Sequence, residues 1–172
     1  DDNTAVGHEA LDANTTGSYN TATGQGALSS VSTGERNTAV GRRALFNATH
    51  SQNTAVGMNC LYENTNGQYN TAVGSRALLN NTTADNNTSG GNNVAIGFNA
   101  LADNTTADGI VAVGYKALRK HTTGNTNTAV GYEALTECTT GTENTACGNE
   151  TLEDCTTGTR NTAVGNIALR EL

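Results

Sequence analysis

Apolar and polar residues alternate along this chain in a pattern that returns about every 17 residues. It reads Asn-Thr-Ala-Val-Gly, two variable residues, Ala-Leu, two variable residues, Asn-Thr-Thr-Gly and two further variable residues. Ten copies fill the sequence, and they begin at residues 3, 20, 37, 53, 70, 93, 110, 127, 144 and 161. We number the positions of each copy from 1 to 17. A unit this short cannot bury an apolar face alone, so the copies are expected to stack.

The stretch at positions 2 to 4 has the β-branched composition of a short strand. Glycine at position 5 is expected to end that strand, and Asn-Thr-Thr-Gly at positions 12 to 15 has the composition of a second turn. Helical repeats need longer units and stronger helix formers. The pattern therefore predicts an all-β fold, a parallel β-solenoid (β-roll) of ten coils of about 17 residues. Residues 1–172 are expected to form one repeat domain, and stacked coils would make a rod of about 45–50 Å.

Three positions never vary within the chain: Ala at position 3, Gly at position 5 and Leu at position 9. Strand alternation places positions 2 and 4 on one face and position 3 on the other. We expect the residue at position 4 and the Leu at position 9 to form a thin core in each coil. The core residues expected on this basis are Val6, Leu11, Val40, Leu45, Val56, Leu61, Val73, Leu78, Ile96, Leu101, Val113, Leu118, Val130, Leu135, Val164 and Leu169.

Ten alanines at position 3 imply a limit on side-chain size at that face. We favour packing of this face against neighbouring chains around a shared axis, because such packing would add to a thin core. The alternative is that Ala faces the Ala-Leu segment inside the coil, while Thr and Val point outward.

The period breaks twice, with one residue lost between Leu45 and Asn53 and six gained between Leu78 and Asn93. The longer step predicts an insertion loop at residues 80–92. Asp85, Asn87 and Ser89 in this loop have the spacing of calcium-loop ligands, although the closing bidentate glutamate is replaced by Ile96. A plain loop and a calcium site are the two interpretations, and calcium is the only cofactor that the sequence suggests.

The four cysteines can be placed by their repeat position. Cys60 and Cys147 replace small apolar residues, so we expect both to be buried. Cys138 and Cys155 share position 12 in consecutive copies, where stacking would bring their Cα atoms to about 4.8 Å. A disulfide between them and a pair of stacked free thiols are both consistent with that spacing.

Phe98, Tyr115 and Tyr132 share position 6 in consecutive copies, which predicts an aromatic stripe along the rod. The stripe is interpreted either as rings that stabilise one another or as a binding strip for a sugar or another partner.

Composition excludes several classes of protein. The chain has a net charge of −7 with nine Lys and Arg, so nucleic acid is not an expected partner. No apolar run approaches the length of a membrane span, and no signal segment or initiator Met opens the chain. His8, His50 and His121 occupy different repeat positions and no nucleophile–base pair is evident, so we expect no enzymatic activity. Although only 35% of the residues are hydrophobic, their strict periodicity argues against disorder.

Asn93-Val94-Ala95-Ile96-Gly97 and Ile110-Val111-Ala112-Val113-Gly114 resemble the head repeats of trimeric autotransporter adhesins. The wider unit N-T-A-V-G-x-x-A-L also resembles repeats in the tail fibres of phages and large viruses. The resemblance implies a left-handed coil, a homotrimer and a location outside the cell, on the cell surface or on a virion. It also implies a cell-surface glycan or receptor as a partner.

Three functions follow as hypotheses. The first is a non-enzymatic structural rod of a fibre or adhesin that presents a surface for attachment. The second is a filament subunit that stacks end to end, because the repeats start at Asn3 and continue to Leu172 without an evident cap, so that we expect either more chain or another subunit there. The third is ice binding by an array of threonines, because Thr fills position 2 in eight of ten copies. Val94 and Val111 interrupt that rank, and the expected core places it inside the coil.

Overall fold

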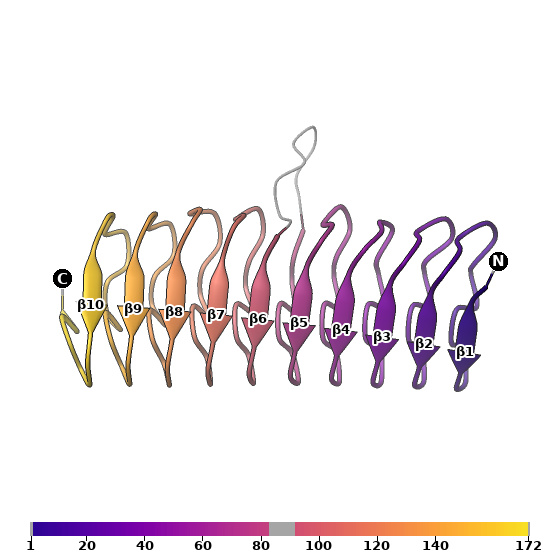
Figure 1. The fold of residues 1–172 in the computed structure, drawn as a ribbon, viewed down its shortest axis with the longest axis horizontal. Coiled ribbons are helices and arrows are strands. Elements are labelled where there is room, and N and C mark those ends of the chain that lie inside the picture. Colours follow the sequence, from indigo (N-terminus) through magenta and orange to yellow (C-terminus); the bar gives the residue numbers. More distant parts are fainter. Residues whose placement is uncertain (1, 83–91, 172) are drawn as a thin grey trace.

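The computed structural model describes residues 2–82 and 92–171. Its strands all run parallel in one sheet and follow the order of the chain from β1 to β10, with no helix among the described residues. The strands lie side by side and point the same way, and each returns behind the sheet to the next (Figure 1). The predicted all-β parallel solenoid is therefore confirmed. The strands are β1 (Thr4–Val6), β2 (Thr21–Thr23), β3 (Thr38–Val40), β4 (Thr54–Val56), β5 (Thr71–Val73), β6 (Val94–Ile96), β7 (Val111–Val113), β8 (Thr128–Val130), β9 (Thr145–Cys147) and β10 (Thr162–Val164).

The register survives both irregular steps. Thr38 of β3 pairs with Thr54 of β4 across the short step, and Thr71 of β5 pairs with Val94 of β6 across the long one. In other coils the position-1 asparagine donates from Nδ2 to the carbonyl of position 15. In the short coil Asn37 Nδ2 donates instead to the His50 carbonyl, at 2.9 Å. The ladder of strands thus continues in register through both changes of length.

Backbone hydrogen bonds join neighbouring coils on both sides of the rod. On the strand side the Thr128 amide donates to the Asn144 carbonyl at 2.8 Å. On the turn side the Leu118 amide donates to the Ala134 carbonyl at 3.0 Å, although this segment is not regular strand. Since both walls of each coil are bonded to the next, bending the rod would stretch backbone hydrogen bonds on one side.

The expected core is wrong at position 4. Val6, Val40, Val56, Val73, Ile96, Val130 and Val164 are between 36 and 72% exposed, and Val113 is half-buried. The middle residue of the strands from β2 onward is buried instead, so Ala points inward while Thr and Val point outward. The physical reason is width: the interior of a 17-residue coil is filled by Ala and by a leucine from the opposite wall, which leaves no room for valine.

The leucines at position 9 do form the core, as expected. Leu45, Leu61, Leu78, Leu101, Leu118 and Leu135 are fully buried and Leu11 nearly so, together with the alanines of positions 3 and 8. Each of these leucines has φ near +50°, as at Leu118, a conformation that L-residues rarely adopt. Burial of the side chain offsets that strain. Leu169 is the exception at 50% exposed, since no described coil lies over it.

The buried alanines also correct our preference for intermolecular packing. Ala112 and Ala129 are fully buried within a single chain, against the Leu side of their own coils. Their size limit therefore comes from inside the coil, which is the alternative that the sequence left open. The alanines give no argument for a trimer.

Glycine at position 5 is required by close approach of neighbouring coils. Gly114 has φ +140°, and a Cβ placed on it would collide with the carbonyl oxygen of Gly131 in the next coil. A larger residue here would force the coils apart.

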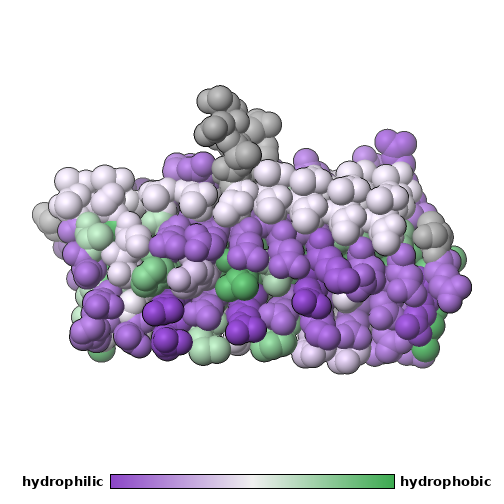
Figure 2. All heavy atoms as spheres, turned by 180° about the vertical axis from the view of Figure 1, so that it is seen from behind, coloured by the Kyte–Doolittle hydropathy of each residue, from purple (hydrophilic) through white to green (hydrophobic). Residues whose placement is uncertain are grey.

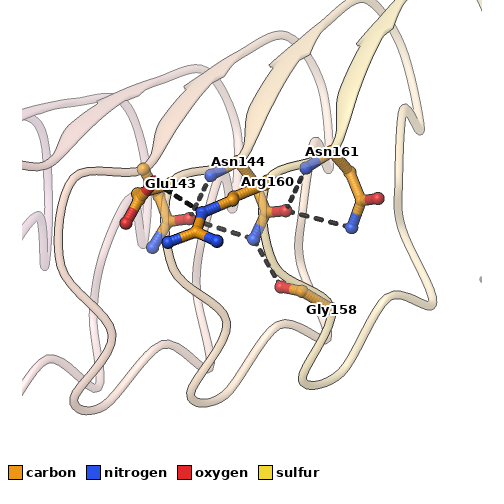
Figure 3. Close-up of polar contacts among 6 residues, drawn as sticks. Glu143, Asn144, Gly158, Arg160 and Asn161 are labelled. Atoms are coloured by element: carbon orange, nitrogen blue, oxygen red, sulfur yellow. Dashed lines mark hydrogen bonds and ion pairs between the residues drawn. The ribbon is translucent and has the colours of Figure 1, made fainter.

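A ladder of asparagines at position 1 runs inside the rod. Asn144 Oδ1 accepts from the Asn161 amide at 3.0 Å, while Asn144 Nδ2 donates to the Gly158 carbonyl at 2.7 Å (Figure 3). Asn144 thus ties its coil to the next and also holds its own turn closed. At Ile110 the ladder is interrupted: the Ile110 backbone amide donates to Asn93 Oδ1 at 3.0 Å, but the isoleucine side chain can form no bond to the next coil.

Candidate functional site

The most regular surface of the molecule is the outward side of the sheet. We call it the Thr–Val face and define it by positions 2 and 4 of every coil. Position 2 contributes Thr4, Thr21, Thr38, Thr54, Thr71, Val94, Val111, Thr128, Thr145 and Thr162, and position 4 contributes Val6, Thr23, Val40, Val56, Val73, Ile96, Val113, Val130, Cys147 and Val164. Strand alternation points both ranks away from the buried alanines, and pairing in register aligns each rank along the rod.

The hydroxyls of the face point away from the rod. Among the described residues, no hydrogen bond within the molecule involves Oγ1 of a position-2 threonine such as Thr54 or Thr128. The threonines of position 13 behave differently: Thr122 Oγ1 donates to the Thr139 carbonyl at 3.0 Å, and Thr105 Oγ1 to the Thr122 carbonyl at 2.9 Å. Position-13 hydroxyls therefore stabilise the rod, whereas position-2 hydroxyls remain available to something outside it.

The face carries no charge over its whole length. Every residue at positions 2 and 4 is Thr, Val, Ile or Cys, while the whole chain has a net charge of −7. Charges lie at other positions, for example in the ion pairs of Lys116 with Glu133 at 2.9 Å and of Lys120 with Glu137 at 2.6 Å. Figure 2 shows the side opposite the strands, where a long band of intermediate hydropathy runs above a hydrophilic region with scattered apolar residues. The Thr–Val face thus contains none of the charged residues of the chain.

Cys147 lies on this face, contrary to the expectation that it is buried. It shares position 4 with the outward valines, so the error has the same cause as theirs. Cys60 is fully buried as expected, and burial raises the pKa of its thiol to about 12. Cys147 is consequently the thiol that solvent reaches.

The structure forms the predicted aromatic stripe. The Phe98 and Tyr115 rings stack with centroids 5.6 Å apart, and the Tyr115 and Tyr132 rings with centroids 5.0 Å apart. The ring planes are within 12° of parallel, so the faces are turned toward one another. A sugar that stacks on an aromatic ring needs a free face, whereas this stripe presents mainly edges to solvent. The geometry favours mutual stabilisation over sugar binding.

Position 12 forms a second internal ladder in which the residue type changes along the rod. Asn104 Nδ2 donates to Asn81 Oδ1 at 2.8 Å, and His121, Cys138 and Cys155 follow in the next coils, all fully buried. Both cysteines are free thiols, so the disulfide is not formed. In-register parallel side chains keep their Cβ atoms about 4.8 Å apart, beyond the usual reach of a disulfide. Burial raises the pKa of Cys138 to about 11, which makes it a poor nucleophile.

The remaining surface offers little chemistry. No group of three His, Cys, Asp or Glu that could hold a metal ion occurs in residues 2–82 and 92–171. The proposed calcium ligands Asp85, Asn87 and Ser89 lie outside the described residues. An open depression of about 380 Å³ lies between Arg43, Tyr62, Glu63 and Arg76, on the side away from the Thr–Val face. Within the described chain, no helix is long and apolar enough to cross a membrane.

The sequence contained a signal for the true orientation of the strands. Position 3 is invariant and small, whereas position 4 varies among Val, Ile, Thr and Cys. Strict size selection is typical of a crowded interior, and tolerance of both hydroxyl and thiol is typical of a surface.

No family model, no curated protein and no solved structure matches this chain. The resemblance to adhesin heads and tail fibres, with the left-handed coil and the trimer that it implies, therefore stays a prediction.

Proposed function

We propose that this chain is a stiff, non-enzymatic structural rod that presents a flat surface for attachment, as part of an extracellular, cell-surface or virion fibre. The observation that carries the proposal is the unbroken ladder of hydrogen bonds through ten coils on both walls of the rod. A force along or across such a rod must break several backbone bonds at one level together.

The buried ladders add to this rigidity. The Asn144 side chain bonds to Asn127, Gly158 and Asn161, which lie in three different turns or coils. Buried amides that are fully bonded favour one register over others, because any slip would leave several of them unpaired.

Chemistry in the described residues supports a mechanical role rather than catalysis. His121 is buried and contacts the Gly124 carbonyl, so it takes part in the internal ladder. Cys138 and Cys155 are buried in the same ladder. His121, Cys138 and Cys155 therefore lack access to a substrate.

The test combines shape and resistance. Small-angle scattering with a measured native mass should give an elongated particle, about 45 Å long per single chain. Limited proteolysis should leave the coils from β2 to β9 uncut. A compact particle, or early cleavage within β2 to β9, would contradict the proposal.

A further inference from the structure

The Thr–Val face repeats itself from coil to coil, and this periodicity restricts what it can recognise. A shift by one coil, about 4.8 Å, places nearly the same side chains over the same points. A protein partner could not select one register on such a surface. It would also find no aromatic or Arg anchor at positions 2 and 4, the residues that usually dominate protein–protein interfaces. A partner that is itself periodic needs neither a unique register nor such an anchor residue.

Because the Thr–Val face has no charged residue, we expect its periodic partner to be uncharged as well. Unpartnered threonine hydroxyls alternate with valine methyls, spaced about 6.6 Å along each strand and about 4.8 Å between strands. A crystalline polysaccharide is normally met by free aromatic faces, whereas the aromatic rings here are stacked on one another. Hydroxyls can join a water lattice, methyls order the water beside them, and strongly hydrated charges, which would disrupt that lattice, are absent.

We propose that the Thr–Val face binds the surface of ice. The proposal rests on the rod proposed above, because it assigns a partner to the surface that the rod presents. Rigidity matters here, since hydroxyls and methyls held in register by the ladder lose little freedom when the lattice forms against them. Val94 and Val111 keep the shape of the Thr rank while removing a hydroxyl, and Ile96 and Thr23 likewise keep position 4 neutral and branched.

The direct test compares two lysine substitutions in the full chain. Thr54→Lys places a charge near the middle of the Thr–Val face, whereas Thr140→Lys places the same charge on an exposed turn away from it. The measurements are thermal hysteresis and enrichment of the protein in slowly growing ice. We expect the parent chain to show both, Thr54→Lys to lose hysteresis several-fold, and Thr140→Lys to match the parent.

A second probe uses the natural thiol of the face. Cys147 is exposed while the other three cysteines are buried, so a bulky maleimide should modify the folded protein at this position. The modified protein should lose hysteresis, and a Cys147→Thr variant treated in the same way should keep it.

Three outcomes would overturn ice binding. The first is no hysteresis and no enrichment at millimolar protein, and the second is equal loss in Thr54→Lys and Thr140→Lys. The third is a native dimer that Thr54→Lys dissociates, which would make the face an interface between two copies. Native mass, circular dichroism and the proteolysis pattern test the rod proposal separately. A folded, elongated, protease-resistant chain without ice activity would contradict ice binding by the Thr–Val face but not the proposal of a structural rod.

Discussion

At the scale of single residues, the face of the strand to which a side chain points decides whether it is buried or exposed. Ala129 and Val130 are neighbours in β8, yet Ala129 is fully buried and Val130 is 37% exposed. Leu135 faces the interior from the opposite wall of the same coil. Adjacent residues of one strand thus differ in environment: the first has a side chain whose size is limited by the interior, and the second has a side chain in contact with solvent.

The first prediction compares glutamate at these two neighbours. Ala129→Glu should lower the free energy of unfolding by at least about 3 kcal/mol, because it buries a charge without a partner. Val130→Glu should change it by no more than about 0.5 kcal/mol, as for an ordinary surface substitution. Urea unfolding at neutral pH measures both. Equal effects, or a stable Ala129→Glu protein of smaller native mass, would mean that the alanines do not face the interior of their own coil.

His121 supplies a prediction for pH. Burial lowers the pKa of its imidazole below the ordinary value, and contacts with backbone carbonyls oppose this only in part. The unfolded chain therefore takes up a proton more readily than the folded one. The contribution of this residue to stability is complete above the ordinary histidine pKa of about 6.5 and falls as the pH drops below it.

The measurement is the urea midpoint at a series of pH values from 8 to 5. His121→Asn introduces asparagine, the residue that occupies the same repeat position at Asn104. This variant should fold, and its urea midpoint should depend less on pH than that of the parent chain. Parallel profiles for the two proteins would show that His121 does not cause the dependence.

At the scale of the repeated element, each coil is defined by contacts with the coil beside it. The glycine after a strand, as at Gly114, approaches the backbone of the next coil, and the asparagine before a strand, as at Asn144, bonds across the same gap. A coil is consequently stable only within a stack.

Two glycines at equivalent positions test the close approach. Gly114 and Gly165 both have positive φ, but a Cβ on Gly114 would collide with Gly131, whereas one on Gly165 has Ala168 as its nearest contact at 3.8 Å. Gly165→Ala should cost about 1–3 kcal/mol through backbone strain alone. Gly114→Ala should cost clearly more, because neighbouring coils must also separate. Thermal or urea unfolding measures the stability lost in each variant. Equal losses in Gly114→Ala and Gly165→Ala would show that close packing of the coils is not the reason for glycine at this position.

The asparagine ladder gives the second prediction at this scale. Asn144→Ala would leave the Gly158 carbonyl and the Asn161 amide without their side-chain partners, so we expect a loss of about 1–3 kcal/mol in the free energy of unfolding. The exposed Asn166 provides the control, since Asn166→Ala should be nearly neutral. If the two variants unfold at the same urea concentration, the ladder contributes nothing to stability.

At the scale of the whole molecule, equivalent coils make the length of the rod adjustable. Removal of residues 110–126 deletes one full coil and joins Gly109 to Asn127. β6 would then pair with β8, and the Asn127 amide would face Asn93 Oδ1 in place of the interrupted ladder at Ile110. We expect this protein to fold as a shorter rod with nearly unchanged stability per coil.

The control is removal of residues 110–117, which takes out the strand of a coil but leaves its second turn. This deletion destroys the register of everything that follows, so the protein should unfold at a lower urea concentration or fail to fold. Circular dichroism and native mass distinguish the two proteins. Similar behaviour of both deletions would contradict the description of the coil as the unit of stability.

The sequence alone determined the architecture, because the repeat is almost uninterrupted. Invariant Gly, Leu and Ala at fixed spacing indicated stacked coils, and repeat positions correctly placed Phe98, Tyr115 and Tyr132 in one stripe and Cys138 beside Cys155. Spacing determines such relationships because identical coils in register superimpose equal positions.

Only the tertiary structure decided which side of each strand faces inward. Alternation separates Thr and Val from Ala but is symmetric between inside and outside, and hydrophobicity alone favoured a buried valine. The choice depends on the width of the coil, which is set by the left-handed backbone at Leu118 and its equivalents on the opposite wall. That narrow interior accepts Ala and Leu and leaves Thr and Val on the surface, where they form the candidate site.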